Sequence, residues 1–138
     1  MNLTDLGRRA VACKHWRWLP GMLASDPGGN RHRIVCHDAG KKYAQTVLQD
    51  YDDAHVDSSV PVDGVIPFLS DPATLGCLLH LVREAWGDPD LSADRVSRAH
   101  DNLPDVWQVY VFHESGAKDV LSGHSEVEAL VAALGAAP

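Results

Sequence analysis

The clearest structural signal in the sequence lies in residues 71–89, which read DPATLGCLLHLVREAWGDP. Asp71 is a favourable N-cap, and Pro72 follows at the first helical position, where its missing N–H costs nothing. Apolar residues then recur at helical spacing, at Leu75, Leu78, Leu79, Val82 and Trp86. Gly87 suits the left-handed position that ends a helix, and Pro89 lies just beyond it. The pattern predicts a central amphipathic helix.

Ahead of this helix, the sequence predicts another helix and a β-hairpin. The helix covers Leu3–Lys14, because apolar residues fall on one of its faces. Pro20-Gly21 predicts a type II turn. Two short runs of β-forming residues, Arg33–His37 and Tyr43–Leu48, are joined by a turn that contains glycine, which indicates a hairpin.

A long acidic stretch, Asp50–Ser70, separates the hairpin from the central helix. A loop of this length in a compact domain indicates either a function or an unrecognised element. Val60–Ile66 is the candidate element, because Asp-Gly between valines is a hairpin signal. The acidic residues lack the spacing of a calcium loop, so we favour a solvated loop over a weak cation site; they are Asp50, Asp52, Asp53 and Asp57.

Beyond the central helix, residues 91–100 have a weakly helical, charged pattern. Trp107–His113 alternates between apolar and other residues, as a half-buried strand does. A turn at Ser115-Gly116 returns the chain through Val120-Leu121 as the second strand of a hairpin. Residues 125–128, Ser-Glu-Val-Glu, form a capping box that predicts a C-terminal helix.

These elements follow the order α-β-β-α-β-β-α. Since hairpins impose antiparallel pairing, we expect an α+β fold in which three main helices pack on one face of an antiparallel sheet of about four strands. The chain has 138 residues, of which 45% are hydrophobic, and this favours a single compact domain over 1–138.

Basic residues are concentrated at the start of the chain. Residues 1–42 hold eight of the twelve lysines and arginines against three acids, a net charge of +5, whereas the remainder has four bases and sixteen acids. Trp16 and Trp18 lie among these bases. A cationic surface that carries indole rings suits an anionic or planar partner. The predicted binding residues are Arg8, Arg9, Lys14, Trp16, Arg17, Trp18, Arg31 and Arg33.

Three segments carry a family resemblance. Residues 9–22, RAVACKHWRWLPGM, together with 71–79 and 81–87, resemble small uncharacterised proteins of tailed bacteriophages and prophages. The resemblance covers about a third of the chain and implies a phage or prophage setting, without any catalytic residue. We therefore expect a non-enzymatic accessory protein that binds an anionic ligand or an acidic partner surface, and that blocks a host or defence function.

Other functions remain open at this point. A small hydrolase or nuclease would use His113, Glu114, His124 and acids of the long loop. A purely structural module would use exposed tryptophans as an oligomer contact, so a homo-oligomer is one possible partner. The net charge of −7 and the lack of a helix-turn-helix or zinc-finger pattern disfavour sequence-specific DNA binding.

The sequence predicts no cofactor and no metal site. Cys13, His15, Cys36 and His37 could together supply zinc ligands, but they lack the usual C-x-x-C spacing. No apolar run approaches the about 20 residues of a membrane span. The N-terminus lacks the basic and apolar order of a secretory signal, so we expect the cytoplasm of a bacterial host as the location.

Overall fold

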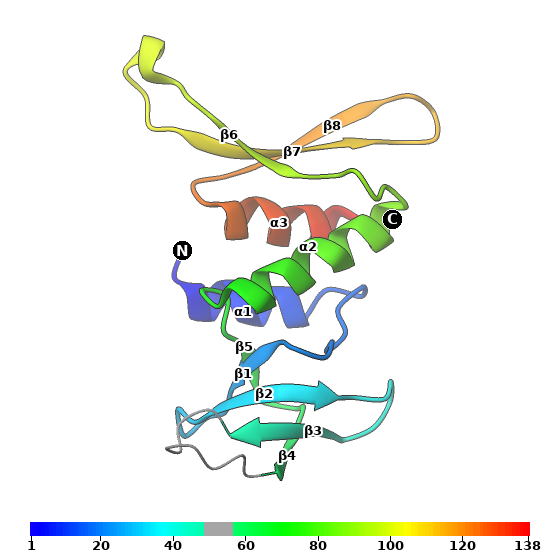
Figure 1. The fold of residues 1–138 in the computed structure, drawn as a ribbon. Helices are drawn as coiled ribbons and strands as arrows, with labels where there is room; N and C mark the ends of the chain where they lie inside the picture. The colour runs from blue at the N-terminus through cyan, green and yellow to red at the C-terminus, as the bar shows by residue number, and fades with distance from the viewer. Residues whose placement is uncertain (49–56) are drawn as a thin grey trace. The chain divides into compact units, whose positions relative to one another are not determined.

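The computed structural model describes residues 1–48 and 57–138. These residues divide into two compact units. Figure 1 shows the helices and strands of both units as a ribbon. Unit 1 comprises Met1–Ala12 and Trp16–Cys77, and unit 2 comprises Cys13–His15 and Leu78–Pro138. The expectation of one domain over 1–138 stays a prediction. No helix within the described ranges is long and apolar enough to cross a membrane.

Unit 1 is built on a five-stranded antiparallel sheet. Its strands are β1 (Leu23–Ser25), β2 (Arg31–Cys36), β3 (Tyr43–Leu48), β4 (Asp57–Pro61) and β5 (Ile66–Pro67). They lie in the order β4-β3-β2-β1-β5. The predicted hairpin is confirmed as β2 and β3, which pair antiparallel from His32 opposite Leu48 to Cys36 opposite Gln45.

The sheet of unit 1 is not flat between its two edges. Strands β4 and β5 occupy its two edges, yet only residues 62–65 connect them. From Pro61 to Ile66 the chain can reach at most about 18 Å. The edges of a flat five-stranded sheet would be about 19 Å apart, and the connection also turns at Gly64, where φ is +89°. The two edges are therefore brought towards each other.

This topology corrects the expectation for Val60–Ile66. The segment does supply two strand ends, but they do not form a hairpin with each other. β4 pairs with β3, with Val60 opposite Ala44, whereas β5 pairs with β1. The acidic residues Asp50, Asp52 and Asp53 lie outside the described residues, and Asp57 is the first residue of β4.

Helix α1 (Leu3–Val11) begins at the Asn2 cap, whose side chain accepts a hydrogen bond from the N–H of Asp5. It lies against β5, and a Cβ added at Gly7 would meet the carbonyl oxygen of Pro67 at 3.2 Å. The helix ends three residues before the predicted Lys14. Helix ends depend on surrounding structure more than on local propensity, and residues 12–15 adopt turns instead.

Helix α2 (Pro72–Trp86) starts in unit 1 and continues into unit 2. Both predicted caps are confirmed. Asp71 accepts a hydrogen bond from the N–H of Thr74 at 2.9 Å. At the other end Gly87 has a φ of +64°, and the N–H of Asp88 bonds to the carbonyl of Arg83 at 3.0 Å, as in a Schellman motif.

Unit 2 contains a three-stranded antiparallel sheet, with one face covered by a helix (Figure 1). Its elements are β6 (Ala93–Val96), the short 3-10 helix η1 (Ala99–Asp101), β7 (Val106–Phe112), β8 (Lys118–Gly123) and α3 (Glu126–Ala136). The predicted second hairpin is confirmed as β7 and β8, and Ser125 caps α3 by accepting from the N–H of Glu128 at 3.2 Å.

The fold is α+β with three main helices and antiparallel sheets, as expected, but the single sheet of about four strands is wrong. There are two sheets. β1 and β6 were not predicted as strands, and β4 and β5 contain the two ends of Val60–Ile66, which had been expected to pair with each other. The weakly helical residues 91–100 contain β6, whose Arg95 lies opposite Trp107 of β7. Pairing with a long neighbouring strand outweighs weak local helix propensity.

Candidate functional site

Two of the predicted binding arginines hold structural ion pairs. Arg8 lies on α1 and contacts Asp5 at 3.1 Å, one turn earlier and exposed to solvent. Arg33 of β2 forms a bidentate ion pair with the carboxylate of Asp71, at 2.7 and 3.1 Å. Its guanidinium also donates to the carbonyl of Gly21 at 2.9 Å. These guanidinium groups are engaged by the protein's own acceptors.

The Arg33–Asp71 pair joins the sheet of unit 1 to the start of α2. Asp71 also accepts from the hydroxyl of Thr74, and that hydroxyl accepts from the backbone N–H of Leu23 at 2.8 Å. The Arg33 hydrogen bonds lower the pKa of Asp71 to about 2, against the opposing effect of burial. Burial, aided by the charge of Asp71, raises the pKa of the nearby Cys77 thiol.

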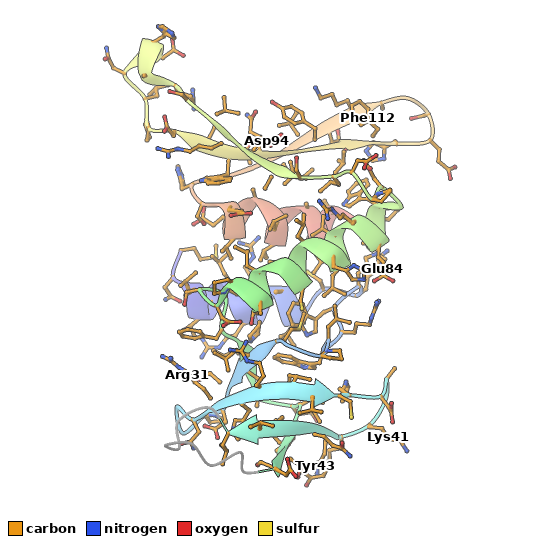
Figure 2. The ribbon with its side chains drawn as sticks, in the orientation of Figure 1. Arg31, Lys41, Tyr43, Glu84, Asp94 and Phe112 are labelled. Atoms are coloured by element: carbon orange, nitrogen blue, oxygen red, sulfur yellow. The ribbon has the colours of Figure 1, made fainter. Side chains whose placement is uncertain are left out.

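Arg31, Arg9 and Lys14 have different surroundings. The guanidinium of Arg31 lies 4.1 Å from the ring centre of Phe68, and Arg9 contacts the sulfur of Met1. Lys14 is exposed and belongs to unit 2. Figure 2 shows Arg31 and Lys41 at opposite ends of the β2–β3 hairpin. Within unit 1, Arg8, Arg31 and Arg33 therefore contact three different segments: α1, Phe68 and Asp71.

Three of the predicted residues do line a common cavity, which we call the tryptophan pocket. Its volume is about 300 Å³. Two segments of unit 1 enclose it: one follows α1, and the other is the β2–β3 connection. The lining residues are Trp16, Arg17, Trp18, Leu19, Pro20, His37, Ala39 and Gly40.

Local turns hold both walls of the tryptophan pocket in place. The predicted type II turn is present, since the N–H of Met22 bonds to the carbonyl of Leu19 at 3.2 Å and Gly21 has a φ of +92°. The N–H of Gly21 then bonds to Ile34 of β2 at 2.8 Å. On the other wall, the His37 ring contacts the carbonyl of Lys41 at 2.8 Å and so closes the hairpin turn.

The two indoles form an edge-to-face pair with ring centres 5.4 Å apart. This agrees with an extended segment, in which residues 16 and 18 share a face and Arg17 takes the other. Trp18 is 5% exposed and belongs to the core, whereas Trp16 is half-buried. The indole N–H of Trp16 is the one buried side-chain polar atom without a hydrogen-bond partner among the described residues.

The charges around the tryptophan pocket favour an anion. Arg17 and His37 are its two titratable lining residues, and no carboxylate lines it within the described part of the chain. A planar, permanently charged guanidinium beside aromatic walls can bind a carboxylate or phosphate through paired N–H groups. The pocket's volume is at the lower end of the range for small-molecule sites.

A second polar constellation in unit 1 has the residue types of a hydrolase triad. His32 contacts Asp26 at 3.0 Å and the hydroxyl of Thr46 at 3.3 Å. The hydrogen bond between Asp26 and His32 is the main reason why the pKa of Asp26 falls to about 2. His32 and Thr46 are only 6% and 2% exposed, so a substrate cannot reach the hydroxyl. The group stabilises the sheet.

The histidines considered for catalysis lie apart in unit 2. His113 follows β7, contacts Asp119 at 2.6 Å and packs edge-on against Trp86. His124 follows β8, at the other end of the same hairpin. The strand residues between them span roughly 17 Å, so these two side chains do not form one acid–base site. Glu114 is exposed in the turn.

No cluster of three or more histidine, cysteine or acidic side chains in residues 1–48 and 57–138 is arranged to hold a metal ion. The possible zinc ligands Cys13 and His15 belong to unit 2, whereas Cys36 and His37 belong to unit 1. All three cysteines are free thiols.

Sequence reasoning missed the second wall of the tryptophan pocket. His37 had been considered only as a zinc ligand, and the Ala39-Gly40 turn only as a hairpin connection. The hairpin signal located the turn correctly. Its position beside residues 16–20 depends on the bond between Gly21 and β2, for which no sequence signal exists.

Comparison of the chain with known protein families, curated proteins and solved structures finds no match.

Proposed function

We propose that this chain is a non-enzymatic binding protein whose tryptophan pocket receives an anionic group, either from a small ligand or from an acidic side chain on a partner protein. The observation that carries the proposal is the composition of the pocket. It combines indole walls with the guanidinium of Arg17 and the imidazole of His37.

The size of the pocket limits what enters it. A volume of about 300 Å³ accommodates a single ring or a short acidic side chain, and it is too small for a long oligonucleotide segment. Lys41 and Lys42 follow directly after the Ala39-Gly40 wall and are exposed, so a larger acidic partner would meet further positive charge there.

The resemblance of residues 9–22, 71–79 and 81–87 to small phage and prophage proteins supplies the biological part of the proposal. In that setting, the chain is an accessory protein that occupies an acidic surface of a host or defence component and blocks it. The resemblance is the support for this part, and the pocket is the support for the binding chemistry.

Phenyl phosphate is a suitable probe, because its ring and its charge match the two features of the pocket. Binding is followed by indole fluorescence and compared with benzyl alcohol, which has the ring without the charge. We expect phenyl phosphate to bind more tightly, and to weaken as salt rises from about 0.05 to about 0.5 M.

Arg17→Gln should weaken phenyl phosphate binding about tenfold, because a charge-assisted hydrogen bond is lost. Arg8→Gln is the matched control: it removes the same charge from unit 1 but lies on α1, outside the pocket. Equal affinity in wild type and Arg17→Gln, or equal losses in both variants, would contradict the proposal.

A further inference from the structure

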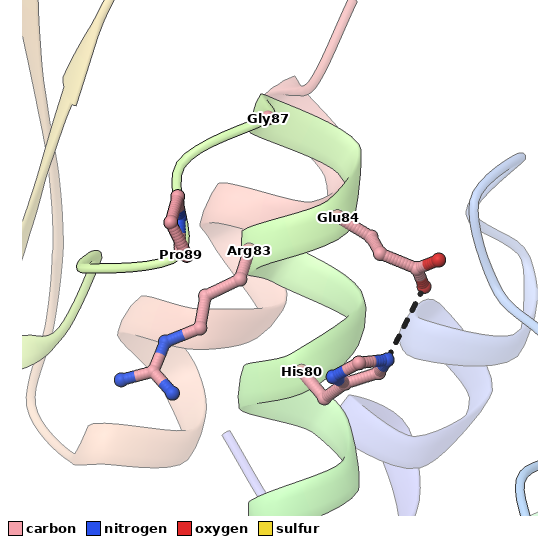
Figure 3. Close-up of a pocket in the computed structure, with 5 residues that line it drawn as sticks. All are labelled: His80, Arg83, Glu84, Gly87 and Pro89. Atoms are coloured by element: carbon pink, nitrogen blue, oxygen red, sulfur yellow. Dashed lines mark ion pairs between the residues drawn. The ribbon is translucent and has the colours of Figure 1, made fainter.

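A second cavity in unit 2 lies at the C-terminal end of α2 and has a volume of about 310 Å³. Four of its lining residues lie on the last two turns of the helix and on its cap, at positions 80, 83, 84 and 87. Figure 3 shows the complete lining: His80, Arg83, Glu84, Gly87 and Pro89.

Arg83 is held in a defined orientation at this cavity. Its Nε–H donates to the carbonyl of Leu91 at 2.8 Å, on the segment that follows α2. The side chain is half-buried, and within residues 1–48 and 57–138 it has no carboxylate partner. The two terminal nitrogens are therefore left to bind a ligand, and they can donate two parallel hydrogen bonds.

The acidic residue that lines the cavity contacts a histidine and not Arg83. Figure 3 shows Glu84 and Arg83 extending to different sides of the helix. The carboxylate of Glu84 lies 3.6 Å from His80, one turn earlier on α2. Glu84 therefore does not neutralise the guanidinium of Arg83.

We propose that this cavity binds a small oxyanion ligand, a carboxylate or a phosphate, through the terminal nitrogens of Arg83. The bond to Leu91 fixes the guanidinium before the ligand arrives, so less side-chain freedom is lost on binding. The half-buried position lowers the local dielectric and strengthens the charge interaction relative to an exposed arginine. This site belongs to unit 2 and does not depend on the tryptophan pocket.

The test is an NMR titration of the full ¹⁵N-labelled chain with sodium phosphate and, separately, sodium acetate at constant ionic strength. The Nε–H signal of Arg83 and the amide signals of Gly87 and Asp88 report on the cavity. We expect saturable shifts at these positions. Saturation by phosphate alone or acetate alone identifies the oxyanion, and saturation by both identifies a general oxyanion site.

Arg83→Gln should weaken the saturable response at Gly87 about tenfold or more. Arg98→Gln, which removes the same charge from unit 2 away from the cavity lining, should leave it unchanged. If Arg83→Gln lowers the thermal midpoint, Arg83→Lys provides the comparison, since it keeps the charge without the planar pair of donors. Linear shifts with both salts, or equal responses in the glutamine variants, would overturn the proposal.

Discussion

Replacing Asp71 with asparagine tests the ion pair that joins α2 to the sheet of unit 1. Asparagine is also a good N-cap, so it can still accept the bond from the N–H of Thr74. What it loses is the negative charge opposite Arg33, which is 29% exposed. The variant therefore separates the ion pair from the helix cap.

The expected loss follows from the pKa of Asp71, which falls from 3.8 to about 2 in the folded protein. A difference of about two units corresponds to roughly 2 kcal/mol of folding free energy near neutral pH. The Asp71 side chain is only 13% exposed, so solvent screening reduces this figure little. We expect Asp71→Asn to lose about 2 kcal/mol.

The pH dependence gives the sharper test. Because folding lowers the pKa of Asp71, its contribution is fully present above pH 3.8 and is lost as the pH falls towards about 2. Asparagine has no such contribution. The difference between wild type and variant should therefore shrink below about pH 4 and disappear near pH 2.

Urea unfolding followed by far-UV circular dichroism, repeated across this pH range, measures both effects. Asp63→Asn is the control, because Asp63 is an exposed acid of the same unit. A loss in Asp71→Asn no larger than that of the control near neutral pH would refute the reasoning. So would a difference that stays constant down to about pH 2.

Three further substitutions test other parts of the fold by the same unfolding measurement. Gly123→Ala should destabilise unit 2 by about 1–3 kcal/mol or more, because the added Cβ would lie 2.5 Å from the Cβ of Glu128 and α3 would have to move. Ser125→Ala removes the N-cap of α3 and should cost about 1 kcal/mol. Asp26→Asn should weaken the bond to His32, with the loss again fading as the pH falls from 3.8 towards about 2. Gly135→Ala is the control for Gly123→Ala and should be neutral or stabilising by up to about 1 kcal/mol, because the nearest atom to its added Cβ is at 3.6 Å. A Gly123→Ala variant as stable as Gly135→Ala would show that α3 does not press on the end of β8.

Helix caps and hairpins, which form through contacts between residues close in sequence, could be predicted from the sequence. The caps of α2 at Asp71 and Gly87 and the cap of α3 at Ser125 are confirmed, because each cap residue bonds to the backbone within a few positions. Both hairpins are confirmed for the same reason, since each turn directly joins the strands that it pairs.

The candidate site was predictable only in part. The alternation of an extended segment predicted that Trp16 and Trp18 share a face, but it placed Arg17 on the other face and did not predict that all three residues line one pocket. The charge pattern could not show that Arg33 is held in an ion pair, because its partner Asp71 lies 38 residues away in sequence.

The amino-acid sequence by itself determined where α2 starts and stops, where α3 starts, that β2 with β3 and β7 with β8 form hairpins, and that the fold is α+β. Only the tertiary structure decided that β5 pairs with β1, that β6 is a strand, and that Arg33 forms an ion pair with Asp71. The reason is physical: caps and turns are stabilised by contacts within a few residues, whereas strand order and ion-pair choice depend on which distant segments can be buried and hydrogen-bonded together.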